Sequence, residues 1–200
     1  MDKYPVPSST QRFELEVKRS KFITTVSHIK DRGDAKILID RIKNEFPAAN
    51  HHCWAYIAGA PDNGSQYNQS DDGEPRGSAG KPMLNVLLHS GLGNIAVVVS
   101  RYFGGIKLGT GGLARAYTQS VGESLASLNT RQQQITENLN IGFPYTLQGR
   151  IDYYLAEEKI EINTKLFDAK IGYSLSVPAS RLNHIKAKLV DLTQGQLSIN

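Results

Sequence analysis

The stretch IAVVVSRY, residues 95–102, decides the fold of the chain. Its first five residues form an uninterrupted aliphatic run, which is typical of a strand that is buried on both faces of a sheet. The next ten residues, FGGIKLGTGG (103–112), contain five glycines and predict a loop. A helix is expected from Gly112 to about Leu128, because apolar residues recur there with helical spacing. The region therefore predicts a strand, a glycine-rich loop and a helix in succession.

The sequence before this stretch predicts the rest of a first domain. Residues 12–17 alternate between apolar and polar, which is the period of a half-buried strand, and 22–29 form its hairpin partner. A helix begins near Asp31 or Asp34, both of which can cap its first turn, and Pro47 ends it. The remaining elements are a strand at 53–57, a polar loop at 58–81 and a short helix at 82–89. Together they predict a ββαβαβα domain over residues 1–130.

The last third of the chain follows a different pattern. Strands are expected at 135–141, 160–167, 170–177 and 196–199, and helices at 144–158 and from Pro178 to Gly195. The order βαββαβ is that of a ferredoxin-like domain. The polar run NTRQQQ, residues 129–134, is the expected linker. The sequence thus predicts an α+β protein of two domains, 1–130 and 135–200.

Composition and charge limit the possible classes of protein. The 200 residues are 40% hydrophobic, which is sufficient for a core, and 23 Lys and Arg against 19 Asp and Glu give a net charge of +4. This excess permits a polyanionic partner without requiring one. The longest aliphatic run, 95–99, is far shorter than the roughly 20 residues of a membrane-spanning helix, and residues 1–20 contain no signal-peptide pattern. With a single cysteine, Cys53, we expect a cytoplasmic protein without a disulfide or a membrane partner.

The glycine-rich segment invites comparison with nucleotide-binding motifs. Gly109, Gly111 and Ala114 match the spacing of the dinucleotide fingerprint, but the preceding strand ends too early and no repeated βαβ unit surrounds it. The Walker spacing fails because Thr110 stands where a phosphate-binding lysine is required. A general anion site remains, since the N–H groups and the dipole of a helix N-terminus attract negative charge.

Arg115 is expected in the first turn of this helix, where the helix dipole disfavours a cation. A bound anion or the chain's own carboxylates would compensate. The candidate carboxylates are Asp71, Asp72 and Glu74, which could cap the helix or pair with Arg101 or Arg115. The sequence leaves two interpretations open, a binding groove and an internal scaffold.

No metal site, cofactor or catalytic pair is predicted. Asp71 and Asp72 are adjacent, without the alternating oxygen ligands of a calcium loop. His51 and His52 are neighbours close to an expected strand and so point to opposite faces, and Cys53 is expected in the core. In the second domain a basic stripe lies opposite the apolar one and is typical of a solvated helix face. It comprises Arg181, His184 and Lys188.

Two blocks of the sequence together resemble the IMPACT family, in its bacterial branch. The first block is SDDGEP (70–75) followed by Gly77, Ala79, Gly80, Pro82 and Met83. The second is VVVSRYFGG (97–105) followed by Leu108, Gly109, Gly111, Gly112, Leu113, Arg115, Ala116 and Tyr117. The resemblance covers the whole chain, while Arg76, Ser78 and Thr110 depart from the family pattern.

The resemblance implies a fold and a role. The first domain should be similar to the second domain of a small-subunit ribosomal protein, and the second to a ferredoxin-like domain of elongation factor G. Eukaryotic relatives regulate translation, and association with RNA or the ribosome is the usual inference for bacterial members. We therefore expect a non-enzymatic binding protein that acts in translation, with RNA, the ribosome or a translation-control protein as its partner.

The residues expected to contact an anionic partner are basic or belong to the glycine-rich segments. They are Arg76, Lys81, Arg101, Tyr102, Gly104, Gly105, Lys107, Gly109, Gly111, Gly112 and Arg115. Four further residues are expected to organise the loops: Ser70, Asp71, Asp72 and Glu74. The alternative is an enzyme or binding protein for a phosphorylated small molecule, with residues 104–112 as the anion site and the carboxylates holding Mg²⁺. A third hypothesis is a module whose loops recognise a protein.

Overall fold

The computed structural model describes residues 3–61 and 66–199. The chain divides into two compact units, Tyr4–Gln133 and a smaller one made mainly of Gln134–Asn200. Each unit has hydrophobic core residues of its own. Within the described ranges, every helix is too short or too polar to cross a lipid bilayer.

The larger unit is built on a five-stranded antiparallel sheet in the order β2-β3-β6-β4-β5. The strands are β2 (Gln11–Val17), β3 (Ser20–His28), β4 (His51–Ile57), β5 (Tyr67–Ser70) and β6 (Ile95–Tyr102). The apolar run 95–102 is β6, the middle strand, and its residues from Ile95 to Arg101 are all buried. The sheet therefore has both of its faces covered around this strand.

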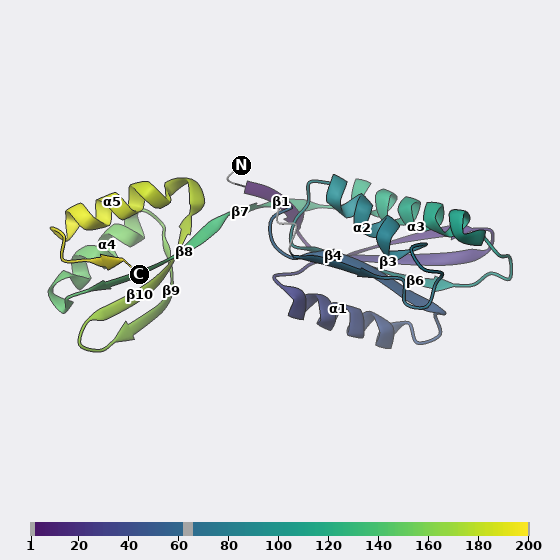
Figure 1. Cartoon of the computed structure of the whole chain (residues 1–200), viewed down its shortest axis with the longest axis horizontal. Helices are drawn as coiled ribbons and strands as arrows, with labels where there is room; N and C mark the ends of the chain where they lie inside the picture. Colours follow the sequence, from purple (N-terminus) through teal and green to yellow (C-terminus); the bar gives the residue numbers. More distant parts are fainter. Residues whose placement is uncertain (1–2, 62–65, 200) are drawn as a thin grey trace. The chain divides into compact units, whose positions relative to one another are not determined.

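Helices cover the two faces of this sheet (Figure 1). α1 (Arg32–Glu45) packs on one face, in the same cluster of buried residues as Val98. α2 (Gly80–His89) and α3 (Gly109–Ala126) lie on the other face, in the same cluster as Val99. Because successive side chains of a strand point to opposite faces, β6 supplies alternate residues to the two layers.

α3 begins earlier than the sequence predicts. We expected a start at Gly112, whereas the helix starts at Gly109 with Leu108 as its N-cap residue. Glycine is a poor helix former, but the apolar side of α3, which includes Leu113 and Tyr117, is buried in the core and holds the first turn in place. Arg115 therefore lies in the second turn, where the unfavourable effect of the helix dipole is weaker than in the first.

Three strands of the larger unit have no clear signal in the sequence. β1 (Lys3–Pro7) and β7 (Thr130–Gln134) form a two-stranded sheet, so the run 129–134, expected as a linker, is mostly a strand. β5 lies within the expected loop 58–81 and pairs with β4; residues 62–65 of that loop lie outside the described residues. Each of these strands exists through pairing with another segment, which a local residue pattern does not report.

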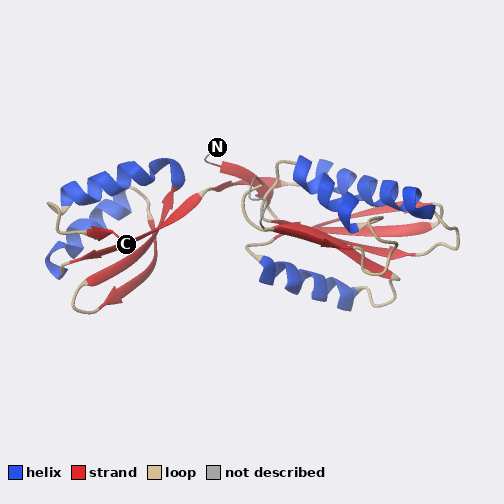
Figure 2. Cartoon of the chain, in the orientation of Figure 1, coloured by secondary structure: helices blue, strands red, loops and turns tan. Residues whose placement is uncertain are grey.

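The smaller unit has the predicted βαββαβ order. Its elements are β8 (Thr136–Phe143), α4 (Gln148–Glu157), β9 (Glu161–Phe167), β10 (Ile171–Pro178), α5 (Leu182–Leu192) and β11 (Ser198–Ile199). The strands form a four-stranded antiparallel sheet in the order β11-β8-β10-β9, and both helices lie on one face of it (Figure 2). The prediction of an α+β protein with a ferredoxin-like second half is confirmed.

Candidate anion-binding site

Two glycine-rich loops lead into the two helices that share one face of the larger sheet. The first loop (71–79) connects β5 to α2, and the second loop (103–108) connects β6 to α3. The first N–H groups of any helix lack partners within the helix and need an acceptor from elsewhere. The two loops differ in the hydrogen-bond acceptors that they supply to these N–H groups.

The first loop carries its own anion. One oxygen of the Asp71 carboxylate accepts the N–H groups of Ala79 (3.0 Å) and Gly80 (2.8 Å), and the other accepts that of Gly77 (2.8 Å). Ala79 and Gly80 start α2, so Asp71 caps this helix. Burial would raise the pKa of Asp71, but the three N–H donors outweigh it and hold the pKa below its usual value. The N-terminus of α2 is therefore occupied by a carboxylate of the chain itself.

Asp72 ties the first loop to the rest of the unit. Its carboxylate accepts from Lys43 Nζ at 2.8 Å and from the N–H of His52 at 2.7 Å, while its own N–H donates to Ser70 Oγ at 3.1 Å. Burial would raise the pKa of Asp72, but Lys43 and the His52 N–H outweigh it, and the pKa lies below its usual value. A Cβ atom on Gly80 would lie 2.7 Å from the backbone of Ser70, so glycine is required where α2 begins.

Glu74 forms a buried ion pair with Arg101. Glu74 Oε1 accepts from Arg101 Nη1 at 2.6 Å and from Tyr117 Oη at 2.8 Å. The two charged side chains are only 3% and 7% exposed, and the guanidinium lies 5.7 Å from the ring centre of Phe103. Burial raises the pKa of Tyr117 and that of Cys53, whose Sγ lies 3.2 Å from Tyr117 Oη. Cys53 is thus a protonated thiol in the core, where the sequence predicts it.

The expectation that Arg101 and Arg115 present free guanidinium groups to one groove needs correction. Arg101 is neutralised by Glu74, as the scaffold interpretation requires. Arg115 is exposed and lines a separate cavity of about 250 Å³ together with Lys18 and Gly112. Because α3 starts at Gly109, Arg115 lies beyond the end of the second loop.

The second loop carries no anion comparable to Asp71. The N–H of Phe103 donates to Asn50 Oδ1 at 2.8 Å, and that of Gly104 to Ser20 Oγ at 3.2 Å. From residue 105 to residue 111, no backbone N–H donates to an acceptor in the described part of the chain. The side chain of the N-cap residue makes no capping hydrogen bond, and the first turn of α3 contains no acidic residue. The second loop and the first turn of α3 therefore contain N–H donors that no acceptor in the described residues satisfies.

Glycine is required in the second loop for two different reasons. A Cβ atom on Gly104 would lie 2.0 Å from the backbone of Arg19, so only glycine lets the loop approach the turn between β2 and β3. Gly105 and Gly109 have φ angles of +84° and +70°, a conformation that other residues rarely adopt. A Cβ atom on Gly111 would meet nothing within 4 Å. The space beside the first turn of α3 is therefore open.

A cavity of about 420 Å³ lies at this helix N-terminus, and both loops contribute to its walls. It is lined by Asn50, His51, Glu74, Pro75, Arg101, Phe103, Lys107, Leu108, Gly109, Thr110 and Leu113. His51 and Arg101 are brought together because they are opposite each other in the pairing of β4 with β6. The cavity thus joins free backbone donors and an exposed lysine to a buried ion pair.

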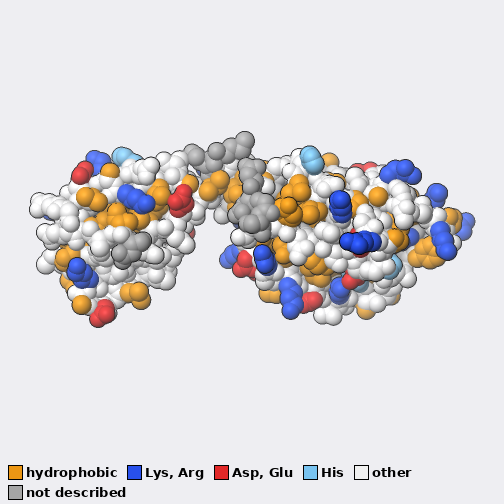
Figure 3. Space-filling model, in the orientation of Figure 1, with side chains coloured by type: hydrophobic (Ala, Val, Ile, Leu, Met, Phe, Trp, Pro, Cys, Tyr) orange, Lys and Arg blue, Asp and Glu red, His pale blue; other side chains and the backbone are white. Residues whose placement is uncertain are grey.

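Several predicted contact residues lie outside the lining of this cavity. Tyr102 is on the opposite face of β6 from Arg101, since neighbouring side chains of a strand alternate. Arg76 and Lys81 are exposed, on the first loop and on α2. On the face drawn in Figure 3, Lys and Arg side chains are scattered and do not line one groove. Of the features predicted for a basic groove, only Lys107 and the free N–H groups of the second loop are found at this cavity in the described residues.

Four polar or aromatic residues of the cavity were not predicted as contact residues: Asn50, His51, Phe103 and Thr110. Phe103 gave a usable signal, because a large aromatic residue follows a buried strand and precedes two glycines. His51 and Asn50 gave none, since their positions follow from the register between β4 and β6. Thr110 departs from both the Walker pattern and the family pattern, and neither departure indicates a place in the cavity.

No group of three metal-ligating side chains occurs among residues 3–61 and 66–199. His51 Nδ1 lies 2.9 Å from the backbone oxygen of Asp72, whereas His52 Nδ1 lies 2.9 Å from Ser100 Oγ on the opposite face of the sheet. Burial lowers the pKa of His52. The two histidines therefore point apart, as their adjacent positions on a strand predict.

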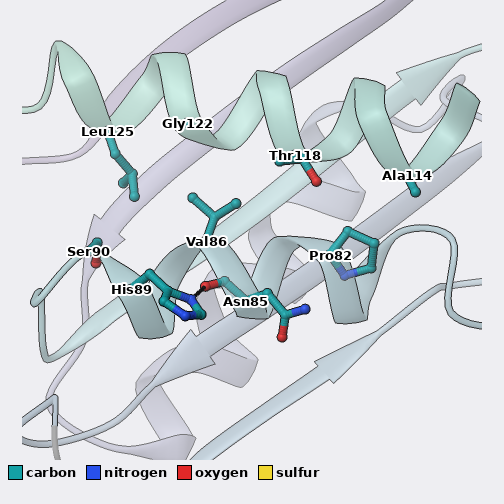
Figure 4. Close-up of a pocket in the computed structure, with 9 residues that line it drawn as sticks. All are labelled: Pro82, Asn85, Val86, His89, Ser90, Ala114, Thr118, Gly122 and Leu125. Carbon is teal, nitrogen blue, oxygen red and sulfur yellow. Dashed lines mark hydrogen bonds between the residues drawn. The ribbon is translucent and has the colours of Figure 1, made fainter. Parts of the chain in front are cut away.

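A second, larger cavity of about 720 Å³ lies between α2 and α3 (Figure 4). Its walls include Val86, Ala114 and Leu125, and its histidine, His89, is bonded through Nδ1 to the backbone oxygen of Asn85 at 2.7 Å. This groove is mainly apolar and does not include the free N–H donors of the second loop. We therefore place the candidate site at the smaller cavity.

Comparisons with known proteins cover both units of the chain. Residues 18–125 match the Impact N-terminal domain, and residues 141–196 match the domain of unknown function DUF1949. The chain is 37% identical over 199 residues to the IMPACT family member YigZ of Escherichia coli K12, covering 100% of this chain and 98% of that protein.

Other relatives give the same result. The chain is 39% identical to an IMPACT family member of Haemophilus influenzae, with 100% and 97% of the two chains covered, and 34% identical to YvyE of Bacillus subtilis, with 93% and 85% covered. A crystal structure described as that of a hypothetical protein has a TM-score of 0.84 and 37% identity, covering 100% and 97% of the two chains. The chain therefore belongs to the IMPACT family, in its YigZ-like branch.

Proposed function

We propose that the chain is a non-enzymatic, cytoplasmic binding protein that acts in translation and holds RNA phosphate groups at the N-terminus of α3. One observation carries the proposal: the backbone N–H groups from 105 to 111 have no acceptor in the described part of the chain. A phosphate accepts from several such donors at once, and the helix dipole favours its charge. Lys107, which lines the same cavity, adds a cation.

The N-terminus of α2 supports an anion as the occupant. There the chain places the Asp71 carboxylate on the N–H groups that start the helix. α3 follows a similar glycine-rich loop, but its first turn contains no acidic residue, and no side chain of residues 3–61 or 66–199 caps it. An anion from outside the chain would satisfy the second helix as Asp71 satisfies the first.

The surroundings of Lys107 favour RNA as the source of the phosphate. Phe103 and Ile106, in the same loop, are 46% and 42% exposed. Single-stranded nucleic acids bind where a cation that attracts the backbone lies beside an aromatic ring on which a base stacks. The role in translation follows from the family resemblance, and fold similarity alone would not justify it.

Filter binding of single-stranded uridine RNA at increasing salt tests this proposal. Each phosphate contact should contribute about −0.7 to the slope of log affinity against log salt concentration. Lys107→Ala should weaken binding and make the slope shallower by roughly that amount. Lys81→Ala and Arg115→Ala remove the same charge outside the cavity and should change the affinity little. Equal losses in all three variants, or no salt-dependent binding, would contradict the proposal.

The size of the cavity favours a second candidate, a phosphorylated small molecule. Its volume of about 420 Å³ falls within the range of roughly 300–1,000 Å³ for small-ligand sites. Thermal shift measurements with nucleotides and sugar phosphates, with and without Mg²⁺, separate the two candidates. A ligand of the folded state raises the melting temperature in proportion to ln(1 + [L]/Kd). Stabilisation that is lost in Lys107→Ala, together with no RNA binding, would favour the small molecule.

A further inference from the structure

We propose that the cavity of about 420 Å³ at the N-terminus of α3 specifically binds an unpaired guanine nucleotide. Glu74 and His51 would accept the N–H groups of the base, and the free N–H groups of the second loop would hold its phosphate. The inference rests on the proposed function, because it names the base that accompanies the bound phosphate. It is carried by hydrogen-bonding atoms of Glu74 and His51, two residues that line the cavity, for which the described residues supply no partner.

The first of these atoms is Glu74 Oε2. Glu74 Oε1 already accepts from Arg101 and Tyr117, whereas Oε2 accepts no hydrogen bond from the described residues and lies 4.0 Å from His51 Nε2. The side chain is only 3% exposed, yet it lines the cavity. Arg101 Nε, also buried, has no acceptor in the described part of the chain. Oε2 is therefore a charged acceptor without a donor among the described residues, and a ligand that donates to it forms a charge-assisted hydrogen bond.

The second atom is His51 Nε2. His51 Nδ1 lies 2.9 Å from the backbone oxygen of Asp72. Because a carbonyl oxygen can only accept, Nδ1 carries a proton, and when the ring holds only this proton Nε2 is an acceptor. Two acceptors, Glu74 Oε2 and His51 Nε2, therefore lie side by side, 4.0 Å apart, at the cavity. They require a ligand with two neighbouring donors.

The walls of the cavity suit a flat ring. Phe103 is 46% exposed, and Pro75, Leu108 and Leu113 supply further apolar surface. A base that enters such a site is held by stacking on aromatic or apolar side chains and by hydrogen bonds to its Watson–Crick edge. Gly109 and Thr110, whose N–H groups have no acceptor in the described residues, line the same cavity, and there the phosphate would accept from them.

Guanine fits this arrangement better than the other three bases. Its Watson–Crick edge presents two neighbouring donors, N1–H and the N2 amino group. Adenine and cytosine place a ring-nitrogen acceptor beside their amino group, and uracil has a carbonyl on each side of its single N–H. In each of these, an acceptor would face Glu74 Oε2 or His51 Nε2, leaving one of them without a donor. The base must be unpaired, because pairing uses the same edge.

The test uses a uridine oligonucleotide with one central guanosine and the same oligonucleotide with adenosine, cytidine or uridine at that place. We expect the guanosine form to bind roughly tenfold to a hundredfold more tightly, as for a pair of base-specific hydrogen bonds. If free GMP competes with the guanosine oligonucleotide, the ligand is a free guanine nucleotide. If GMP does not compete, the ligand is guanosine within RNA. Both outcomes support guanine recognition. Equal affinity for the four oligonucleotides overturns the inference and leaves the proposed function standing. Absence of any RNA or GMP binding overturns both.

Variants locate the preference in the cavity. In Glu74→Gln the amide oxygen must take the place of Oε1, which accepts from Arg101 and Tyr117, so a donor replaces the acceptor at Oε2 and the guanosine preference should disappear. If Glu74→Gln does not fold, His51→Phe replaces it as the cavity variant, because His51 is less buried than Glu74. It removes the other acceptor and should also abolish the guanosine preference. Replacing guanosine by inosine, which lacks the N2 amino group, should remove part of the preference. Asn85→Ala, in the groove between α2 and α3, is the matched control. An undiminished preference in both cavity variants overturns the inference.

Discussion

The helices α2 and α3 lie on the same face of one sheet, and each follows a glycine-rich loop, yet their N-termini differ. At α2, the Asp71 carboxylate accepts the N–H groups of Ala79 and Gly80. At α3, the N–H groups from 105 to 111 have no acceptor in the described residues. The N-terminus of α2 is completed by the chain, whereas that of α3 keeps free donors among the described residues, where we propose that an anion binds.

This difference shows what a glycine-rich loop before a helix does and does not indicate. Glycine permits close approach at Gly80 and at Gly104, and in both loops it allows positive φ angles. The glycines alone therefore do not distinguish a scaffold from a binding site. The distinguishing feature is whether the chain supplies an acceptor for the free N–H groups.

The largest effect is expected from breaking the link between the first loop and β6. Glu74→Ala leaves Arg101 buried without its partner and should lower the free energy of unfolding by about 3–5 kcal/mol. Urea unfolding followed by the fluorescence of Trp54, the single tryptophan, reports on the larger unit. Glu14→Ala removes an exposed ion pair with Lys21 and should cost less than about 1 kcal/mol. Equal losses of unfolding free energy in the two variants would show that the buried ion pair stabilises the unit no more than an exposed one does.

A smaller effect is expected at the capped helix. Asp71→Asn keeps the acceptor for Ala79 and Gly80 but removes the charge and the acceptor for Gly77. The free energy of unfolding should fall by about 1–2 kcal/mol at neutral pH. Urea unfolding of the larger unit measures this change.

The pH dependence of Asp71→Asn checks the cause of the loss. The pKa of Asp71 is lowered in the folded chain. Its stabilisation is therefore complete above the pKa of the unfolded chain, about 4, and is lost as pH falls through the lower, folded value. The variant and the parent protein should converge in stability in acid. A constant difference between them down to low pH would speak against a charge at the N-terminus of α2.

The uncapped helix is probed by removing one donor. Thr110→Pro deletes a backbone N–H that has no acceptor in the described chain, and proline is tolerated in the first turn of a helix. Affinity for single-stranded RNA should fall roughly tenfold, as for one hydrogen bond to a charged group. Thr110→Ala keeps the N–H and should bind almost normally. If the two variants bind equally, the backbone donor is not what holds the RNA.

Much of the fold is predictable because its main elements have local patterns. The apolar run of β6 places it at the centre of its sheet, and the order of elements from 135 to 200 gives the ferredoxin-like arrangement. β7 could not be predicted from the sequence, because TRQQQ is polar and forms a strand only by pairing with β1. The early start of α3 was missed because glycine propensity is overruled by the burial of Leu113 and Tyr117.

The candidate site was predictable in its loops but not in its partners. Sequence identified the glycines, Lys107 and the three carboxylates, and it left open whether Glu74 pairs with Arg101. Only the strand register places His51 opposite Arg101, and only the folded chain shows that the Glu74–Arg101 pair is buried. The orientation of Tyr102 was predictable, because neighbouring side chains of a strand such as β6 point to opposite faces.

The most direct measurement of the difference between the two helices is the backbone amide NMR spectrum during titration with single-stranded RNA. The amide signals of residues 105–111 should shift strongly, because their N–H groups gain a phosphate acceptor. Those of Gly77, Ala79 and Gly80, whose N–H groups already donate to Asp71, should stay in place. Signals from 105–111 that remain unchanged at saturating RNA would contradict the account.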